Sequence, residues 1–158
     1  MTLSKIFSIV IAGILLSISS CKVPAIIDKD PKNFFAYYLF GELRIHEARN
    51  DDAVPFLSKA AQLQPNFAAV HTELGKIMFK KNDAAGAVRE LEQSIRLDPD
   101  DTTALYQLSI AYRKVGQKEK AQAALVRVKE LNEERRKLGA TKFITERFRK
   151  ARNQALAP

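Results

Sequence analysis

The chain repeats itself every 34 residues, and this period constrains its fold more than any other feature of the sequence. Phe34, Ala68 and Thr102 begin three units that align without a gap. Four columns then agree across the units: Gly41, Gly75 and Ser109; Ala53, Ala87 and Ala121; Leu57, Leu91 and Leu125; Ala60, Ser94 and Val128. Self-similarity at a fixed period of this length predicts stacked supersecondary units that together bury one continuous core.

Each unit has the pattern of two helices that cross closely. In the second unit, His71, Leu74, Gly75 and Met78 are spaced i, i+3, i+4 and i+7, which places them on one helical face. Ala87, Leu91 and Ser94 form the facing stripe of the next helix. The small residues Gly75 and Ala87 allow the two helices to approach. A larger side chain at either position is therefore expected to overpack the crossing and cost about 1–3 kcal/mol.

Turn and cap residues separate the helices. Asn82 tolerates the left-handed conformation of a helix end, and Asp83 is expected to cap the helix that follows. Gly116 provides the turn in the third unit. Asp52 is expected to cap the second helix of the first unit. That start would leave Pro55 in the first turn, where its missing N–H is harmless.

These columns resemble the tetratricopeptide repeat (TPR), whose pattern has a bulky residue, Leu-Gly, an aromatic residue, Ala, a large apolar residue and a final Pro. Pro65 and Pro99 hold the final position of the first two units, and Glu133 holds it in the third. The resemblance covers residues 34 to about 135. It implies an all-α fold, a right-handed α-solenoid of three TPR helix pairs with a C-terminal capping helix. The expected organisation is a signal peptide at 1–20, a tether at 21–33, repeats at 34–67, 68–101 and 102–135, and a basic capping helix at 136–158.

In this family the first helix of each pair lines a concave groove. The resemblance therefore implies a partner-binding face made of Phe35, Tyr38, Glu42, Ile45, Thr72, Lys76, Phe79, Lys80, Tyr106, Ile110, Arg113 and Lys114. One end of this face is aromatic and apolar, and the other end is cationic. We expect a partner peptide or helix with apolar anchors and an acidic stretch. The alternatives are that the cations only solvate the face while some aromatic side chains pack internally, or that two copies form a homodimer through it.

Several known chemistries have no counterpart in the sequence. Chaperone-binding members of the family use a carboxylate clamp of Lys, Asn and Arg, but the matching positions hold Tyr38, Glu42, Glu73, Thr103 and Gln107. There is no Gly-rich phosphate loop and no Ser nucleophile elbow. His46 and His71 are the only histidines, and His71-Thr72-Glu73 lacks the second histidine of a zinc site. We therefore expect no enzyme activity, no cofactor and no metal.

The first twenty residues have the pattern of a secretory signal. Lys5 precedes an apolar run from Ile6 to Leu16, which is about half of the ~20 residues that a spanning helix needs. Ile18-Ser19-Ser20-Cys21 resembles a bacterial lipobox. That resemblance implies that the Cys21 sulfur carries a lipid and that cleavage makes this cysteine the N-terminus. The alternatives are ordinary secretory cleavage and an uncleaved signal anchor in which Cys21 is incidental.

Export to the bacterial cell envelope changes the meaning of the positive charge. The 26 Lys and Arg against 18 Asp and Glu give the chain a net charge of +8. Outside the cytoplasm this balance favours an acidic protein or a membrane surface over nucleic acid. Lys22 rather than Asp follows the cysteine, which by resemblance to enteric lipoproteins favours the periplasmic side of the outer membrane. The function expected is a lipid-anchored, non-enzymatic scaffold or assembly factor of the pilus, secretion or outer-membrane assembly type.

The tail beyond the third repeat is helical and basic. We expect helix to Leu138, a stop at Gly139, and a new helix with Thr141 as its N-cap. An apolar stripe made of Ile144, Phe148 and Ala151 is expected to dock on the third repeat as a cap. Cations cluster around Phe143 and Phe148: Lys142, Arg147, Arg149, Lys150 and Arg152. The alternative function is a membrane-surface protein whose basic C-terminal helix binds anionic lipid, and the two roles are compatible.

Overall fold

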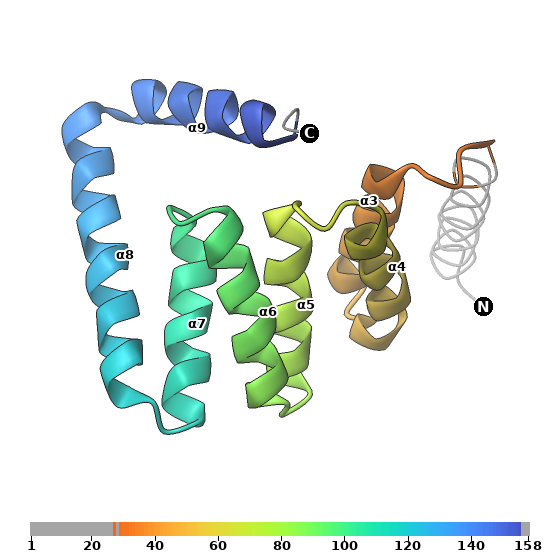
Figure 1. The fold of residues 1–158 in the computed structure, drawn as a ribbon, viewed down its shortest axis with the longest axis horizontal. Helices are drawn as coiled ribbons and strands as arrows, with labels where there is room; N and C mark the ends of the chain where they lie inside the picture. The colour runs from red at the N-terminus through yellow and green to blue at the C-terminus, as the bar shows by residue number, and fades with distance from the viewer. Residues whose placement is uncertain (1–26, 28, 156–158) are drawn as a thin grey trace, which may run out of the picture.

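A computed structural model describes residues 27 and 29–155, without the side chains of residues 140, 141, 143 and 151–155. The described residues form seven helices: α3 (Phe34–His46), α4 (Asn50–Leu63), α5 (Ala68–Lys80), α6 (Ala84–Leu97), α7 (Thr102–Lys114), α8 (Lys118–Leu138) and α9 (Ala140–Ala155). They contain no strand, so the all-α helical repeat predicted from the 34-residue period is confirmed. Figure 1 shows the helices as a row of antiparallel neighbours, with α9 crossing one edge of the row.

The helices pack in consecutive pairs. Helix α3 lies on α4, α5 on α6 and α7 on α8, while α4 against α5 and α6 against α7 join one pair to the next. Glycines make the closest crossings. A Cβ on Gly41 would lie 2.6 Å from Leu57 Cγ, and a Cβ on Gly75 would lie 2.6 Å from Leu91 Cγ and 3.3 Å from the Ala87 carbonyl oxygen. Glycine is therefore required at both crossings, because an added methyl group has no space there.

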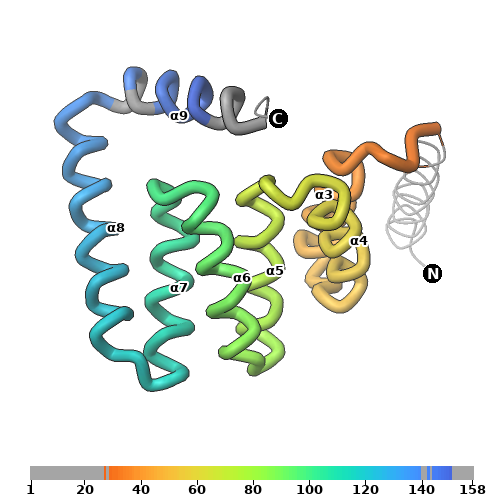
Figure 2. The backbone as a smooth tube through the Cα atoms, viewed as in Figure 1, coloured from red at the N-terminus to blue at the C-terminus, as the bar shows by residue number. Residues whose placement is uncertain are grey.

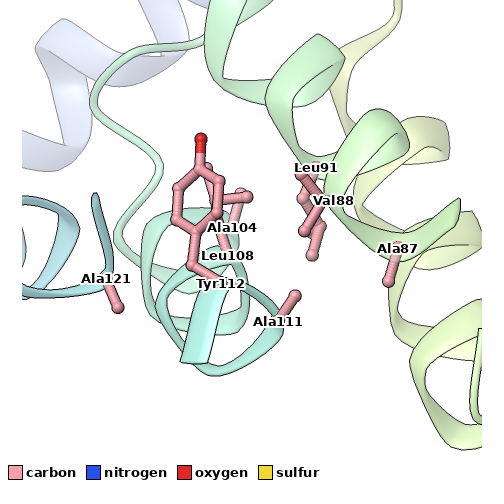
Figure 3. Close-up of a cluster of buried hydrophobic side chains, with 8 residues drawn as sticks. All are labelled: Ala87, Val88, Leu91, Ala104, Leu108, Ala111, Tyr112 and Ala121. Carbon is pink, nitrogen blue, oxygen red and sulfur yellow. The ribbon is translucent and has the colours of Figure 1, made fainter. Parts of the chain in front are cut away.

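Two clusters of buried apolar side chains form the core. The first joins α4 to α5 and consists of Ala53, Leu57, Ala60, Val70, Leu74 and Ile77. The second joins α6, α7 and the start of α8 and consists of Ala87, Val88, Leu91, Ala104, Leu108, Ala111, Tyr112 and Ala121, as Figure 3 shows. The Tyr112 hydroxyl leaves this apolar cluster and donates a 2.7 Å hydrogen bond to Glu92 on α6. Both clusters lie between repeats, so each repeat depends on its neighbour for burial.

The expected turns are formed at two of the three helix pairs. Asn82 adopts a φ of 63° and Gly116 a φ of 82°, and the Asp83 carboxylate accepts a 2.7 Å hydrogen bond from the Gly86 N–H as the cap of α6. The prediction for α4 was wrong. Asp52 does not cap this helix, because α4 begins at Asn50 and Asp52 accepts a 2.6 Å hydrogen bond from Arg49 Nε. Pro55 consequently lies beyond the first turn and removes one N–H donor from the helix interior.

Helix α8 is longer than the other helices and is followed by a sharp bend. It continues to Leu138 and ends at Gly139, whose φ of 73° confirms the predicted stop. Helix α9 begins directly at Ala140, so Thr141 lies inside it and the predicted N-cap at Thr141 was wrong. The tube in Figure 2 shows that this single bend turns α9 back over the ends of α7 and α6. The connection is too short for a separate capping residue.

Candidate protein-binding groove

The first helices of neighbouring pairs lie near one another, since α5 contacts α7 and Tyr38 of α3 contacts Phe67, the residue before α5. The acidic residues that act on the Tyr38 phenol belong to α3, to α5 and to the cap of α7. Burial, together with the negative charges of Glu42, Glu73 and Asp101, raises the pKa of Tyr38 to about 12. Glu73 belongs to α5 and Asp101 caps α7. The Tyr38 phenol on α3 therefore lies near acidic groups of α5 and of the α7 cap.

The α3 end of this face is aromatic. The Phe35 ring stacks on Tyr38 with 6.1 Å between centroids, and Tyr38 meets Phe67 edge-on at 5.0 Å. Phe35 nevertheless remains 48% exposed, and Leu39, one helical turn later, is 50% exposed. Leu39 was not predicted as a site residue, although its i+4 spacing from Phe35 gave the signal. An apolar patch is therefore open to a ligand at this end.

The centre of the face is acidic, which the sequence analysis did not anticipate. Lys76 was grouped with the cationic end, but its Nζ lies 2.7 and 2.6 Å from the two carboxylate oxygens of Glu73. Glu42 Oε1 is buried and has no hydrogen-bond partner among the described residues. Burial, and then the charge of Glu73, raise the pKa of Glu42, while Lys76 and His46 oppose the increase. The free cationic charge on the face is therefore smaller than the sequence suggested.

The cationic end is made of side chains in the last turns of α5 and α7. Lys80, Arg113 and Lys114 are exposed there. The apolar residues nearby are partly used by the core, because Ile45 packs against the first cluster and Phe79 against the second, and Ile110 is half-buried. Tyr106 differs from them, since half of it is exposed on α7. Phe35 and Tyr106 are therefore the aromatic site residues most open to a partner.

Thr72 was assigned to this face incorrectly. It is 4% exposed, and its hydroxyl lies 2.6 Å from the buried Ser94 hydroxyl on α6. The same Oγ1 also lies 3.4 Å from the Ala68 carbonyl oxygen. Thr72 thus satisfies Ser94 inside the second helix pair, which is what a buried polar group requires. It is a packing residue.

The two histidines have different surroundings. His71 Nδ1 lies 2.9 Å from Glu90 Oε2, and Nε2 lies 3.0 Å from the Pro65 carbonyl oxygen, so the ring bridges α5 to α6 and to the preceding turn. The hydrogen bond to Glu90 is the main reason that the pKa of His71 is raised, and burial opposes it. His46 is exposed at the end of α3. Within the described part of the chain, no three acidic, histidine or cysteine side chains gather where a metal ion could bind.

The basic tail is divided between two surfaces. Arg147 donates to Asp98 Oδ2 at 2.8 Å and to the Asp100 carbonyl oxygen at 2.7 Å, and Lys150 lies 3.0 Å from Asp100 Oδ2. Lys142 and Arg149 are exposed.

The predicted docking of the apolar stripe was wrong for the two members whose side chains are described, because Ile144 is 52% and Phe148 73% exposed. Among the described side chains of α9, Arg147 and Lys150 hold the helix by polar contacts to Asp98 and Asp100.

Some predicted features lie outside what the structure describes. They are Cys21 and the segment before it, and the side chains of Phe143, Ala151 and Arg152. None of the helices in residues 29–155 is long and apolar enough to cross a membrane.

The repeated helix pairs match a known protein family. The profile described as "Tetratricopeptide repeat" matches residues 44–101 and 78–138, which together are more than half of the chain. The chain belongs to the tetratricopeptide repeat family. It therefore carries a TPR protein–protein interaction domain of a kind that binds peptide partners, in a family that is typically non-catalytic.

Individual relatives are distant. The human (Homo sapiens) protein "DnaJ homolog subfamily C member 3" is 26% identical over 77 residues, which are 49% of this chain and 15% of that protein. Among solved structures, a MamA structure has a TM-score of 0.66 at 20% identity and covers 84% of both chains. "MamA MSR-1 C2" has a TM-score of 0.61 at 22% identity, and the TPR chain spans 64% of its length. YrrB, described as "a TPR protein with an unusual peptide-binding site", has a TM-score of 0.58 at 20% identity over 63% of this chain and 51% of its own. At these identities the likeness shows the fold alone.

Proposed function

We propose that this TPR protein is a non-enzymatic scaffold or assembly factor that binds a segment of another protein across α3, α5 and α7. The observation that carries the proposal is the exposure of about half of Phe35 and Tyr106 on the face that the family uses for binding. Large aromatic side chains supply most of the binding energy at protein interfaces when a partner covers them. YrrB, a protein of the same fold, is described as having a peptide-binding site, which supports the binding of a protein segment.

The charges of the face suggest how the partner segment is arranged. Apolar side chains of the partner would cover Phe35 and Leu39 at the α3 end. An acidic stretch would lie near Lys80, Arg113 and Lys114, whose charges are exposed. The acidic centre around Glu42 and Glu73 would reject acidic residues between those two regions. This order gives the bound segment a direction, which complementary charges commonly set at interfaces.

A peptide array tests the proposal. Apolar segments flanked on one side by Asp and Glu should bind, whereas segments flanked by Lys and Arg should not. The variants Phe35→Ala and Tyr106→Ala should each weaken binding about tenfold or more, as buried aromatic contacts commonly do. Lys80→Glu combined with Lys114→Glu should remove the preference for acidic flanks. Val126→Ala and Lys129→Glu on α8 are the matched controls, since both residues are exposed away from the face. Equal binding by all variants would contradict the proposal.

We also propose that the protein acts in the bacterial cell envelope, lipid-anchored through Cys21 on the periplasmic side of the outer membrane. The support is the lipobox-like Ile18-Ser19-Ser20-Cys21 behind an apolar run, with Cys21 the only cysteine of the chain. The test is the intact mass of the protein from membrane fractions, for the wild type and Cys21→Ala. Removal of residues 1–20 with added acyl chains, lost in the variant, would support the anchor. A full-length or unlipidated mass would contradict it.

A further inference from the structure

Helix α9 leaves two of its apolar residues, Ile144 and Phe148, largely exposed. Ile144 and Phe148 are spaced one turn apart, so they lie on the same side of the helix, and Phe148 is 73% exposed. The body holds α9 through Arg147 and Lys150, by hydrogen bonds to Asp98 and Asp100 in the α6–α7 turn. A helix fixed by its polar side chains while an aromatic side chain faces solvent has an apolar face available for another surface.

The charge around this face is strongly positive. Residues 135–150 contain seven Lys and Arg and one acid, Glu146, which gives 7 − 1 = +6. Arg147 and Arg149 stand on either side of Phe148 in the sequence, so they also flank it around the helix. Lys142 and Arg149 are exposed and form no ion pair within the described part of the chain. Exposed apolar residues on a helix that also carries unpaired cations fit the boundary between anionic headgroups and acyl chains.

The position of α9 in the fold agrees with this partner. The start of α3 meets the start of α5 where the Phe34 and Phe67 rings lie 5.4 Å apart, and α7 begins beside Asp100, which holds Lys150 of α9. The first helices therefore all begin at the edge along which α9 lies (Figures 1 and 2). Residues 22–33 could bring this edge within roughly 40 Å of Cys21, at ~3.3 Å per residue. A membrane anchor at Cys21 would place this edge next to lipid.

We propose that α9 binds an anionic membrane surface, with Ile144 and Phe148 at the boundary between headgroups and acyl chains and with Lys142 and Arg149 against the lipid phosphates. The groove on α3, α5 and α7 remains free in this arrangement, because α9 docks on the α6–α7 turn. The membrane surface would then orient the protein, and the groove would bind the partner.

A tryptophan reporter tests the proposal in the full-length chain, which contains no tryptophan of its own. Phe148→Trp is placed in the proposed contact, and Val126→Trp, at a residue 46% exposed on α8, is the control. Each variant is added to phosphatidylglycerol vesicles and to phosphatidylcholine vesicles. We expect Trp fluorescence from position 148 to shift to the blue, and to be quenched by brominated acyl chains, only with phosphatidylglycerol. The signal from position 126 should not change.

A second variant pair tests the cations. Lys142→Gln with Arg149→Gln in the Phe148→Trp background should lower partition into anionic vesicles about 30-fold, since each basic residue contributes about fivefold. Equal shifts in both lipids, or an equal shift at position 126, would overturn the proposal. So would a shift that appears without vesicles as the protein concentration rises, because α9 would then bind a second copy. These results do not depend on lipidation or on the groove, so they separate this proposal from the function proposed above.

Discussion

Helices α6 and α8 occupy the same place in consecutive repeats, but only α6 is covered by a following repeat. Val88, Leu91 and Ile95 of α6 pack against α7 in the second core cluster. One period later the same positions of α8 hold Gln122, Leu125 and Lys129, and the first and last of these are exposed. Polar side chains at stacking positions cannot be buried without losing their hydration, so they prevent another repeat from docking. The array therefore ends because the stacking positions of α8 are polar, and the described side chains Arg147 and Lys150 hold α9 by polar contacts to the α6–α7 turn.

The largest expected difference between the two helices is at the matched leucines. Leu91→Ala should lower the free energy of unfolding by about 2–5 kcal/mol, because the side chain is almost fully buried against Gly75 and α7. Leu125→Ala should cost only about 1 kcal/mol, since Leu125 is half-buried. Urea denaturation of both variants measures the difference. Equal losses would mean that α8 is as fully covered as α6, which would contradict the difference between the two helices.

The glycine column gives the next largest effect. Gly75→Ala should cost about 1–3 kcal/mol, because the new Cβ would meet Leu91 Cγ at 2.6 Å and the Ala87 carbonyl oxygen at 3.3 Å. The third repeat already accommodates a side chain in this column, since Ser109 is fully buried and its hydroxyl donates a 2.6 Å hydrogen bond to the Tyr106 carbonyl oxygen. Ser109→Ala is therefore the matched control and should cost less than about 1 kcal/mol. A tolerated alanine at position 75 would show that the second crossing is as loose as the third.

A smaller expected effect is a pH dependence of the folding stability that arises in the second repeat and has no counterpart at the matching position of the third. The pKa of His71 is raised by its hydrogen bond to Glu90, whereas the same column of the third repeat holds the buried Leu105. The folded protein therefore binds this proton more tightly than the unfolded chain does. The stabilisation is fully present below the unfolded pKa of about 6.5 and is lost as the pH rises through the higher folded value.

Urea denaturation between pH about 6 and about 8 should accordingly show stability falling with pH. His71→Gln should remove this part of the slope. His46→Gln is the matched control, because His46 is exposed and is the only other histidine of the chain. If His71→Gln leaves the slope unchanged, the bridge to Glu90 and Pro65 contributes no proton-linked stability.

The sequence predicted the helical repeat better than it predicted the candidate binding face on α3, α5 and α7. A period of 34 residues is a property of the chain, so the helix pairs, the glycine crossings and the cap at Asp83 could be predicted from spacing alone. The pairing of Lys76 with Glu73 could also have been predicted, because the two residues have i, i+3 spacing on one helix. Thr72 could not be placed in this way, because its partner Ser94 is 22 residues away and on another helix. Likewise, nothing in the sequence of α9 indicates that Arg147 and Lys150 would meet Asp98 and Asp100.

The smallest expected effect on stability concerns how α9 is held. Arg147→Gln removes the ion pair to Asp98 and the hydrogen bond to the Asp100 carbonyl oxygen. Because these groups are partly exposed and screened by solvent, the free energy of unfolding should fall by only about 0.5 kcal/mol.

Hydrogen exchange is the more sensitive measurement, since α9 amides should exchange faster while those of α7 stay protected. Arg149→Gln, two residues further along at an exposed position, should change neither. Added salt should act on α9 of the wild type as Arg147→Gln does, because screening weakens the same pairs. If α9 stays protected in both cases, apolar contacts hold it, and α8 and α9 together form a true apolar cap like the contact between α6 and α7.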